Sequence, residues 1–321
     1  MSPVLPISSS FWRPGQSKLA GSNGVVPFAG RIGANQEFSI HEDSSSQREL
    51  LEKVPDAAPW IPLKDALSMR PILQPELWKG AVVEAIGSCL FTFLSIFVSV
   101  GLNNMVGAFD SGPLVPGLVG AGTVVVALPL FVYSMGPVSG AHINPMITIA
   151  TFFGRLATLP RAILYLSFQT FGAAVSGWIL RESFGTRSFQ VPGCFLDTNT
   201  MTLRRAFTIE FVTDFALIFF SFAVGLDPRQ RDVYGPALGP ILIGFAVAMC
   251  AFFTGITIPG YGGFSGNPGR CFAAMVGSHF ESYHWIHWVG PLAASMAHGV
   301  LYYLLPPSTN TRPGVTPDCN S

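Results

Sequence analysis

The chain has 321 residues, of which 49% are hydrophobic and only 11% are charged, and its mean hydropathy is +0.45. This composition provides too little polar surface for a soluble globule of that size, so it indicates a protein embedded in a lipid bilayer. The formal net charge is zero and no Lys/Arg block is present, which argues against nucleic acid as a partner. The five cysteines lack a CxxC pair and predict no metal site, cofactor or disulfide framework: Cys89, Cys194, Cys250, Cys271 and Cys319.

The first segment, residues 1–76, is rich in Ser, Pro and Gly. Its apolar residues follow neither a helical nor a strand period, so we expect a mostly disordered N-terminal tail on the cytosolic side. No continuous apolar core follows a basic start, which is unlike a secretory signal peptide. The first acidic residue is Glu37, and this leaves an organellar transit peptide as the alternative.

Six apolar stretches follow from Trp78 onwards, and each is long enough to cross a hydrocarbon core, which takes about 20 helical residues. Two further apolar pieces, 137–154 and 257–277, are shorter and are broken by Gly and Pro. We expect both to be re-entrant segments, because a membrane tolerates irregular backbone only where protein buries it or water reaches it. The predicted spans are approximately 80–101, 116–136, 159–180, 205–226, 235–256 and 284–305.

The order span, span, half-helix, span occurs twice along the chain. A carboxylate interrupts the first span of each copy, Glu84 in one and Glu210 in the other, and an Asn-Pro pair begins each half-helix. An odd number of crossings per copy makes the two copies inverted in the membrane. The sequence therefore predicts an all-α membrane protein built as an inverted repeat. Its expected parts are a first repeat at 77–181, a connecting loop at 182–204, a second repeat at 205–306 and a C-terminal tail at 307–321.

The two half-helix motifs are SGAHINPM, which begins at Ser139, and SGNPGR, which begins at Ser265. Each proline suits a first helical turn, where its missing N–H costs nothing, and the Asn before it suits the helix cap. Two helix N-termini then meet at the membrane midplane, where their partial positive charge disfavours cations and protons. The Asn amides can donate to a passing oxygen, so the pattern predicts a pore for neutral solutes. The pore-motif residues are Asn144, Pro145, Met146, Asn267, Pro268 and Gly269.

These motifs resemble those of the aquaporin (major intrinsic protein) family, together with three others: Glu84-x-x-Gly87, Gln169-x-x-Gly172 and Trp288-Val-Gly-Pro291. The resemblance covers about residues 77–306 and implies a homotetramer with one pore in each subunit. It also implies that Glu84 and Glu210 accept the hydrogen bonds that hold the half-helix loops, since a buried carboxylate needs donors.

The chain departs from the family at the third position of each Asn-Pro motif. Ala is usual there, and this chain has Met146 in the first motif and Gly269 in the second. A large residue in one half and a small one in the other compensate each other if the two half-helices abut. The alternative is that Met146 closes the lumen.

The resemblance also places a selectivity filter at four positions: Val124, Gly255, Phe264 and Arg270. The fixed charge of Arg270 repels cations, and its N–H groups replace the hydration that a solute loses. Phe264 and Gly255 resemble the glycerol-conducting branch of the family, and Val124 is smaller than the aromatic residue that either branch tends to carry. The predicted aperture is therefore wider and less polar than a strict water filter.

Two other residues favour the water-conducting branch. Cys271 follows the filter arginine where the glycerol branch usually has Asp, and Trp288 is similar to the water branch. We expect Cys271 to be a thiol that the helical turn directs away from the lumen. The prediction is thus a channel for water, and also for glycerol or other small neutral solutes that fit the aperture.

The orientation follows from the basic residues of the connections. Arginines near Arg155 and Arg229, and the lack of Lys and Arg in 102–115, place both termini in the cytoplasm, and we expect the plasma membrane rather than an internal one. The connection between the third and fourth spans disagrees with this orientation, because it carries Arg181, Arg187, Arg204 and Arg205.

Three other functions are alternatives to a channel: an intramembrane enzyme, a secondary transporter and a non-conducting scaffold. No HExxH or GxSxG motif supports an intramembrane enzyme. A secondary transporter also uses inverted repeats, and a non-conducting or gated scaffold would keep the fold without steady flux. Near the outer mouth, His279, His284 and His287 suit a membrane interface better than a pH gate or a metal site.

Overall fold

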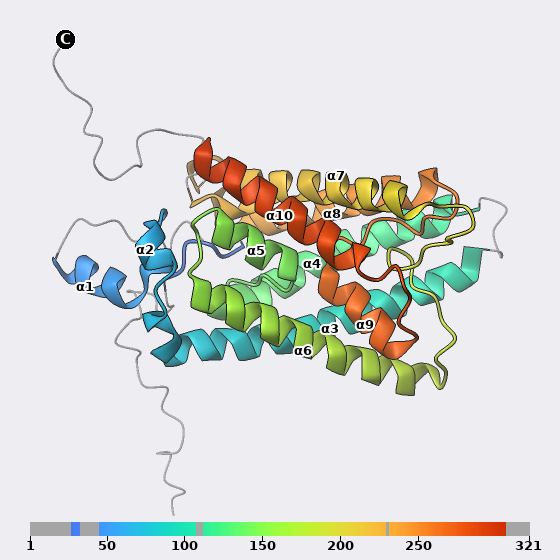
Figure 1. The fold of residues 1–321 in the computed structure, drawn as a ribbon, viewed down its shortest axis with the longest axis horizontal. Helices are drawn as coiled ribbons and strands as arrows, with labels where there is room; N and C mark the ends of the chain where they lie inside the picture. Colours follow the sequence, from blue (N-terminus) through green and yellow to red (C-terminus); the bar gives the residue numbers. More distant parts are fainter. Residues whose placement is uncertain (1–26, 33–44, 107–111, 229–230, 306–321) are drawn as a thin grey trace, which may run out of the picture.

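The chain folds into a bundle of long helices that run along the long axis of the molecule, with two short helices between them (Figure 1). The structure, a computed structural model, describes residues 27–32, 45–106, 112–228 and 231–305. The short helices are α5 (Pro145–Phe153) and α9 (Pro268–Gly277). The long ones are α3 (Pro75–Met105), α4 (Leu114–Ser139), α6 (Leu159–Phe184), α7 (Leu203–Ser221) with its π-helical continuation η6 (Phe222–Leu226), α8 (Arg231–Thr257) and α10 (Ile286–Leu304).

Five of the described helices are long and apolar enough to cross a membrane by length and composition, namely α3, α4, α6, α7 with η6, and α8. The sixth expected span forms α10, which is not among these five. It carries three polar side chains that are buried in the protein, those of His287, Ser295 and His298. α10 nevertheless lies lengthwise on α7 (Figure 1), and its 19 residues extend for about 28 Å, close to the thickness of a hydrocarbon core.

The two repeats contribute matching helix pairs. α3 packs against α6 in the first repeat and α7 against α10 in the second, while α4 and α8 pack on each other across the repeats. A Cβ on Gly172 of α6 would lie 2.1 Å from the carbonyl oxygen of Ala85 on α3, so only glycine permits this close approach. α5 packs on α6 and α10, and α9 packs on α6. The element order is the one that the sequence predicts.

Part of the N-terminal tail is folded, which differs from the disorder expected over residues 1–76. Its described part forms α1 (Ser45–Lys53), η3 (Pro55–Ala57), α2 (Leu63–Ala66) and η4 (Arg70–Leu73), and residues 27–32 are buried. Asp56 of η3 pairs with Arg161 of α6, 105 positions further along the chain. Contacts of that range leave no local hydrophobic period, so the sequence pattern does not reveal them. The predicted tail at 307–321 lies outside the described residues.

Candidate pore

α5 and α9 begin at asparagines that tie the two half-helices together. The Oδ1 atom of each side chain accepts from the backbone N–H two residues later, at 3.0 Å for Asn144 and 2.9 Å for Asn267. These bonds cap the helices and satisfy N–H groups that would otherwise lack partners. The Nδ2 atom of Asn144 donates to the carbonyl of Gly266 at 2.7 Å, and that of Asn267 donates to the carbonyl of Ile143 at 3.1 Å. Each cap is therefore fixed by the loop of the opposite repeat.

Glu84 is fully buried on α3 and accepts hydrogen bonds from the loop before α5 and from α6. The backbone N–H groups of His142 and Ile143 donate at 3.0 and 2.6 Å, the Ser139 hydroxyl at 2.6 Å and the Gln169 amide at 2.8 Å. Ile143 has a φ of 54°, a conformation that is strained for a β-branched residue. The hydrogen bonds to Glu84 offset this strain and hold the loop in place.

Glu210 is the counterpart of Glu84 in the second repeat and is also fully buried. The backbone N–H of Ser265 lies 3.0 Å from both carboxylate oxygens, and the Ser265 hydroxyl donates at 2.7 Å. The hydroxyl of Tyr261 donates to the other oxygen at 2.7 Å. The two carboxylates therefore occupy equivalent positions behind the two half-helix loops.

A cavity of about 560 Å³ extends beside the two asparagines and takes its wall from both repeats. About half of the residues that line it belong to α3, α4 and α8, and most of these are apolar. Polar groups enter it at a few points, including Asn144, Asn267 and Arg270. A lumen of this kind offers hydrogen bonds at a few defined places and an apolar wall between them. This arrangement suits the passage of small uncharged molecules.

The four predicted filter residues line this same cavity: Val124, Gly255, Phe264 and Arg270. They come from α4, the end of α8, the loop before α9 and the first turn of α9. A Cβ built on Gly255 would meet no atom within 4 Å, so this position faces open space. The structure thus brings together residues that lie far apart in the sequence.

Arg270 is held by partners that the sequence analysis did not identify. Its Nη2 atom donates to the Ser99 hydroxyl and to the carbonyl of Pro192, each at 2.9 Å, and its Nη1 atom lies 3.4 Å from the sulfur of Cys194. Pro192 and Cys194 belong to the loop between α6 and α7, which also lines the cavity through Gln190 and Phe195. No motif marks these residues, because their role depends on where the loop folds.

The cysteine prediction is wrong at two positions. Cys194 and Cys271 form a disulfide across 77 residues, so Cys271 is not a free thiol and the chain does have a covalent cross-link. Neither cysteine is among the described residues that line the cavity. The disulfide joins the loop that binds Arg270 to the residue that follows Arg270. The odd number of scattered cysteines concealed this pair, whereas Cys89 and Cys250 are free.

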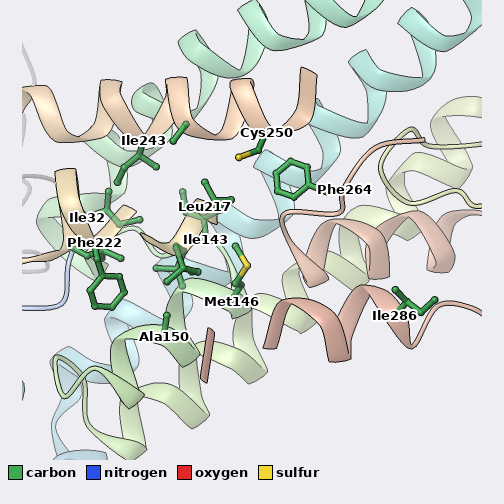
Figure 2. Close-up of a cluster of buried hydrophobic side chains, with 14 of the residues drawn as sticks. Ile32, Ile143, Met146, Ala150, Leu217, Phe222, Ile243, Cys250, Phe264 and Ile286 are labelled. Carbon is green, nitrogen blue, oxygen red and sulfur yellow. The ribbon is translucent and has the colours of Figure 1, made fainter. Parts of the chain in front are cut away.

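Met146 is fully buried and is not among the described residues that line the cavity. Figure 2 shows it in a cluster of apolar side chains with Ile143 and Leu217. A Cβ on Gly269 would lie 3.6 Å from Pro145 and 3.7 Å from Ala173, rather than against Met146. The structure therefore gives no support to a lumen closed by Met146, because this side chain packs in the core.

The described residues contain no group of three or more His, Cys, Asp or Glu side chains that could hold a metal ion. His284 accepts a hydrogen bond from the indole of Trp288 at 3.2 Å, and its ring lies beside Phe272. His287 is buried with its Nδ1 atom 3.7 Å from Glu210. These histidines pack among aromatic and polar neighbours inside the second repeat.

An all-helical membrane bundle in which two half-helices meet at their asparagine caps, beside a lumen, defines a class of multi-pass channel proteins. The family model for major intrinsic proteins matches residues 72–303. The chain therefore belongs to the major intrinsic protein, or aquaporin, family, and it is a channel protein rather than an enzyme.

Individual relatives agree with this assignment. Aquaporin TIP1-1 of Zea mays is 32% identical over 240 residues, which are 74% of this chain and 91% of the relative. Aquaporin TIP1-1 of Arabidopsis thaliana is 32% identical over 249 residues, with 75% and 93% covered. The X-ray structure of the aquaglyceroporin from Plasmodium falciparum matches with a TM-score of 0.51 at 20% identity, covering 70% of this chain and 94% of that one. This last match supports the fold.

Proposed function

We propose that the protein passes water, and also glycerol or other small neutral solutes, and that it excludes ions and protons. The observation that carries this proposal is the convergence of two capped helix N-termini and Arg270 on one cavity. The helix ends carry partial positive charge and Arg270 a full one, so a cation would leave water for a repulsive site. A neutral solute has no such penalty and can accept hydrogen bonds from the same groups.

The solute range follows from the filter positions. Val124 and Gly255 are small, and the position of Gly255 faces open space, so the proposed aperture admits a three-carbon polyol as well as water. Phe264 supplies an apolar surface for a carbon backbone, while Arg270 supplies donors for hydroxyl groups. The relatives named above are aquaporins, which supports water as one permeant.

The test is the swelling and shrinking of proteoliposomes that contain the purified protein, measured by stopped-flow light scattering with water and then with glycerol. We expect flux above that of empty liposomes, with a low activation energy and no saturation. A secondary transporter would saturate, and a non-conducting scaffold would match empty liposomes both as the parent and as the Gly30→Ala variant introduced below. A proton current through the protein with Arg270 intact would contradict the proposed exclusion of protons.

We also propose that the protein forms homotetramers in the plasma membrane with both termini in the cytoplasm. α2 and the C-terminal end of α10 lie at the same end of the bundle (Figure 1). α3 presents an exposed apolar stripe at helical spacing, formed by Val82, Ile86 and Leu90, which can face lipid or a neighbouring subunit. Light scattering of the detergent-solubilised complex would give the mass of four chains, and the mass of one chain would contradict the tetramer.

A further inference from the structure

A short piece of the N-terminal tail, residues 27–32, is buried at one end of the bundle; we call it the tail segment. Phe28, Ala29, Arg31 and Ile32 are each at most 3% exposed. Its contacts are made with the SGAH loop that precedes α5. The N–H of Ile32 donates to the carbonyl of Gly140 at 2.7 Å, and the Arg31 guanidinium donates to a carbonyl at the end of α4 at 2.8 Å. The tail segment is thus bonded to the loop that positions the first half-helix.

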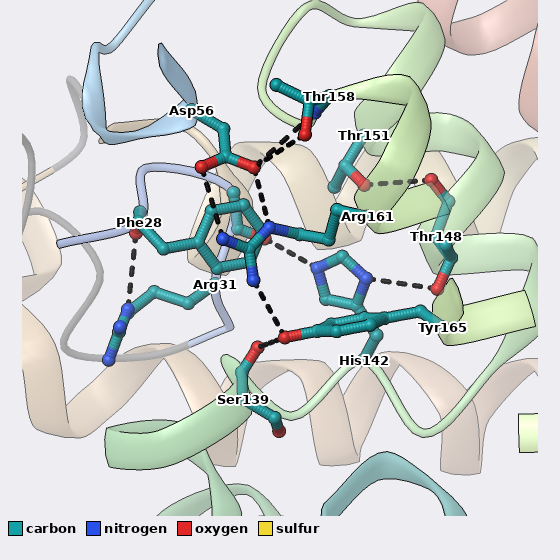
Figure 3. A network of polar contacts seen from close by, with 11 residues as sticks. Phe28, Arg31, Asp56, Ser139, His142, Thr148, Thr151, Thr158, Arg161 and Tyr165 are labelled. Carbon is teal, nitrogen blue, oxygen red and sulfur yellow. Dashed lines mark hydrogen bonds and ion pairs between the residues drawn. The ribbon is translucent and has the colours of Figure 1, made fainter. Parts of the chain in front are cut away.

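His142 connects the tail segment to the motif itself (Figure 3). Its Nε2–H donates to the carbonyl of Gly30 at 2.8 Å, while its Nδ1 atom accepts from the Thr148 hydroxyl on α5 at 3.0 Å. The tail segment therefore completes the hydrogen bonding of a buried motif residue, which would otherwise have to find another acceptor at this position.

Arg161 of α6 anchors the tail segment from the other side. Its guanidinium lies 3.9 Å from the centre of the Phe28 ring, which is a cation–π arrangement. It donates to both carboxylate oxygens of Asp56, at 2.6 and 3.1 Å, and to the Tyr165 hydroxyl at 2.9 Å. The N–H of Ala29 donates to the backbone carbonyl of Asp56 at 2.7 Å, so two pieces of the tail are bound together on α6 (Figure 3).

Ile32, the last residue of this anchored segment, lines the lumen. It lines the same cavity as the two asparagines and Arg270, and so do Leu217 and Ile243 of the apolar cluster that contains Ile32. Figure 2 shows Ile32 next to Leu217 and Phe222 within the apolar cluster. A side chain from the tail therefore occupies the wall of the pore at the mouth farther from the filter.

We propose that this mouth is a binding site for a peptide, that its ligand is the tail segment of the same chain, and that the docked segment closes the pore. The site recognises an aromatic ring stacked under Arg161, a backbone carbonyl facing His142 and an aliphatic side chain in the lumen. Closure of the pore rests on the proposed function, because only a pore that conducts can be closed. Binding and closure can each be measured without solute flux.

Docking buries a charge, and the free-energy cost of that burial opposes docking. Arg31 is only 1% exposed, and burial lowers its pKa to about 10, which still leaves it protonated at neutral pH. Removing a charge from water costs free energy that hydrogen bonds to two carbonyls recover in part. In the proposed state the tail segment is a reversible ligand, because this cost lowers the net free energy gained on docking.

Gly30 provides the variant that tests the proposal. A Cβ at this position would lie 2.6 Å from the backbone carbonyl oxygen of Leu156 and 3.0 Å from the Phe28 ring, so Gly30→Ala cannot keep the docked geometry. The matched control is Gly101→Ala on α3, where a Cβ meets nothing within 4 Å. A second variant, Phe28→Ala, removes the ring under Arg161 without adding volume. Phe28→Ala replaces Gly30→Ala in the measurements if Gly30→Ala does not fold.

The first measurement is water permeability of proteoliposomes that contain the full chain. Release of the tail segment should raise permeability several-fold in Gly30→Ala and in Phe28→Ala, while Gly101→Ala matches the parent. Equal permeability of the parent and both folded release variants, above that of empty liposomes, would overturn the closure. Permeability at the background of empty liposomes in all variants would refute the proposed function, and the next measurement would still decide the closure.

The second measurement is the reaction rate of an engineered thiol with a charged methanethiosulfonate reagent in detergent, in a background of Cys89→Ser, Cys250→Ser and Cys319→Ser. Ser221→Cys places the thiol in the lumen near Ile32, and Asn103→Cys places it at the opposite mouth. Gly30→Ala should raise the rate at position 221 and leave the rate at 103 unchanged. Equal rates at 221 with and without Gly30→Ala would overturn the proposal.

The third measurement is hydrogen–deuterium exchange of the tail segment. The N–H groups of Ala29 and Ile32 donate to protein carbonyls and should exchange slowly in the parent. They should exchange rapidly in Gly30→Ala, and Gly101→Ala should retain the protection. Rapid exchange in the parent would show that the mouth does not bind the tail segment, and that result would overturn the proposal.

Discussion

The guanidinium of Arg270 donates to the hydroxyl of Ser99 at 2.9 Å, so this charged side chain on α9 is bonded to α3. This bond crosses from the second repeat to the first, at the side of the lumen. The carbonyl of Pro192 holds the same Nη2 atom at 2.9 Å. The position of the Arg270 charge therefore depends on two elements outside the half-helix that carries it.

Ser99→Ala should relax the filter without preventing folding. The change removes one partner of Arg270 at a cost of about 1 kcal/mol, and the guanidinium then samples a wider range of positions. We expect glycerol flux to rise relative to water flux in proteoliposomes. The matched control is Ser95→Ala, one turn earlier on α3, whose hydroxyl bonds to a backbone carbonyl of its own helix. An equal shift of the flux ratio in both variants would argue against a specific role of Ser99.

Glu84→Ala and Glu210→Ala should impair folding more than selectivity. Each substitution leaves several N–H and O–H groups of a half-helix loop without an acceptor, at about 1–3 kcal/mol for each buried group. Thermal unfolding in detergent and the yield of monodisperse protein measure the effect. Glu182→Ala, at the exposed end of α6, is the control and should behave as the parent. Normal stability and flux in both variants would refute the supporting role.

Gly255→His combined with Val124→Phe should abolish glycerol flux and spare most water flux. The added rings fill space that a carbon backbone needs, while Arg270 and the new imidazole still offer hydrogen bonds to water. Gly255→Ala adds a single methyl group in open space and should reduce glycerol flux only slightly. The measurement requires a background that conducts glycerol, either the parent or Gly30→Ala. Undiminished glycerol flux in the double variant would place these residues outside the constriction.

Loss of the Cys194–Cys271 disulfide should lower stability and loosen the filter. The disulfide joins residues 77 positions apart and so lowers the conformational entropy of the unfolded chain. In the chain-entropy model this stabilises the folded state by about 4 kcal/mol. Cys194→Ser and Cys271→Ser should each lower the melting temperature and make it insensitive to reductant, whereas Cys89→Ser, at a free thiol, should not. The glycerol-to-water flux ratio should rise as well, since the loop that carries Pro192 supports Arg270. A reductant-sensitive melting temperature in Cys194→Ser would contradict this prediction.

The sequence predicted the features that local patterns encode. The hydropathy of the long helices and the Asn-Pro starts of α5 and α9 depend on neighbouring residues only, and the structure has these elements in the predicted order. Glu84 and Glu210 were identifiable because a carboxylate in an apolar span needs partners. Counting from the asparagines selected four residues that line one cavity, and their role as a selectivity filter stays a prediction.

The remaining features depend on contacts between distant residues. The tail segment is apolar only in part, and its burial rests on Arg161 and His142, which lie more than a hundred positions away. The partner of Cys271 is a loop residue that no motif marks. The direction of the Met146 side chain depends on how α5 is rotated against its neighbours, and a position in a motif does not determine that rotation.

The reciprocal bonds of the two asparagines also constrain the order in which the protein can be completed during synthesis. The amide of Asn144 donates to Gly266, 122 residues later in the chain. At ribosomal rates of about 5–20 residues per second, roughly 6–24 s pass before that acceptor is made. The first half-helix loop must therefore wait in the membrane with its amide satisfied by water or by other protein groups. The two reciprocal hydrogen bonds between the repeats can therefore form only late in synthesis, when both half-helix loops are present.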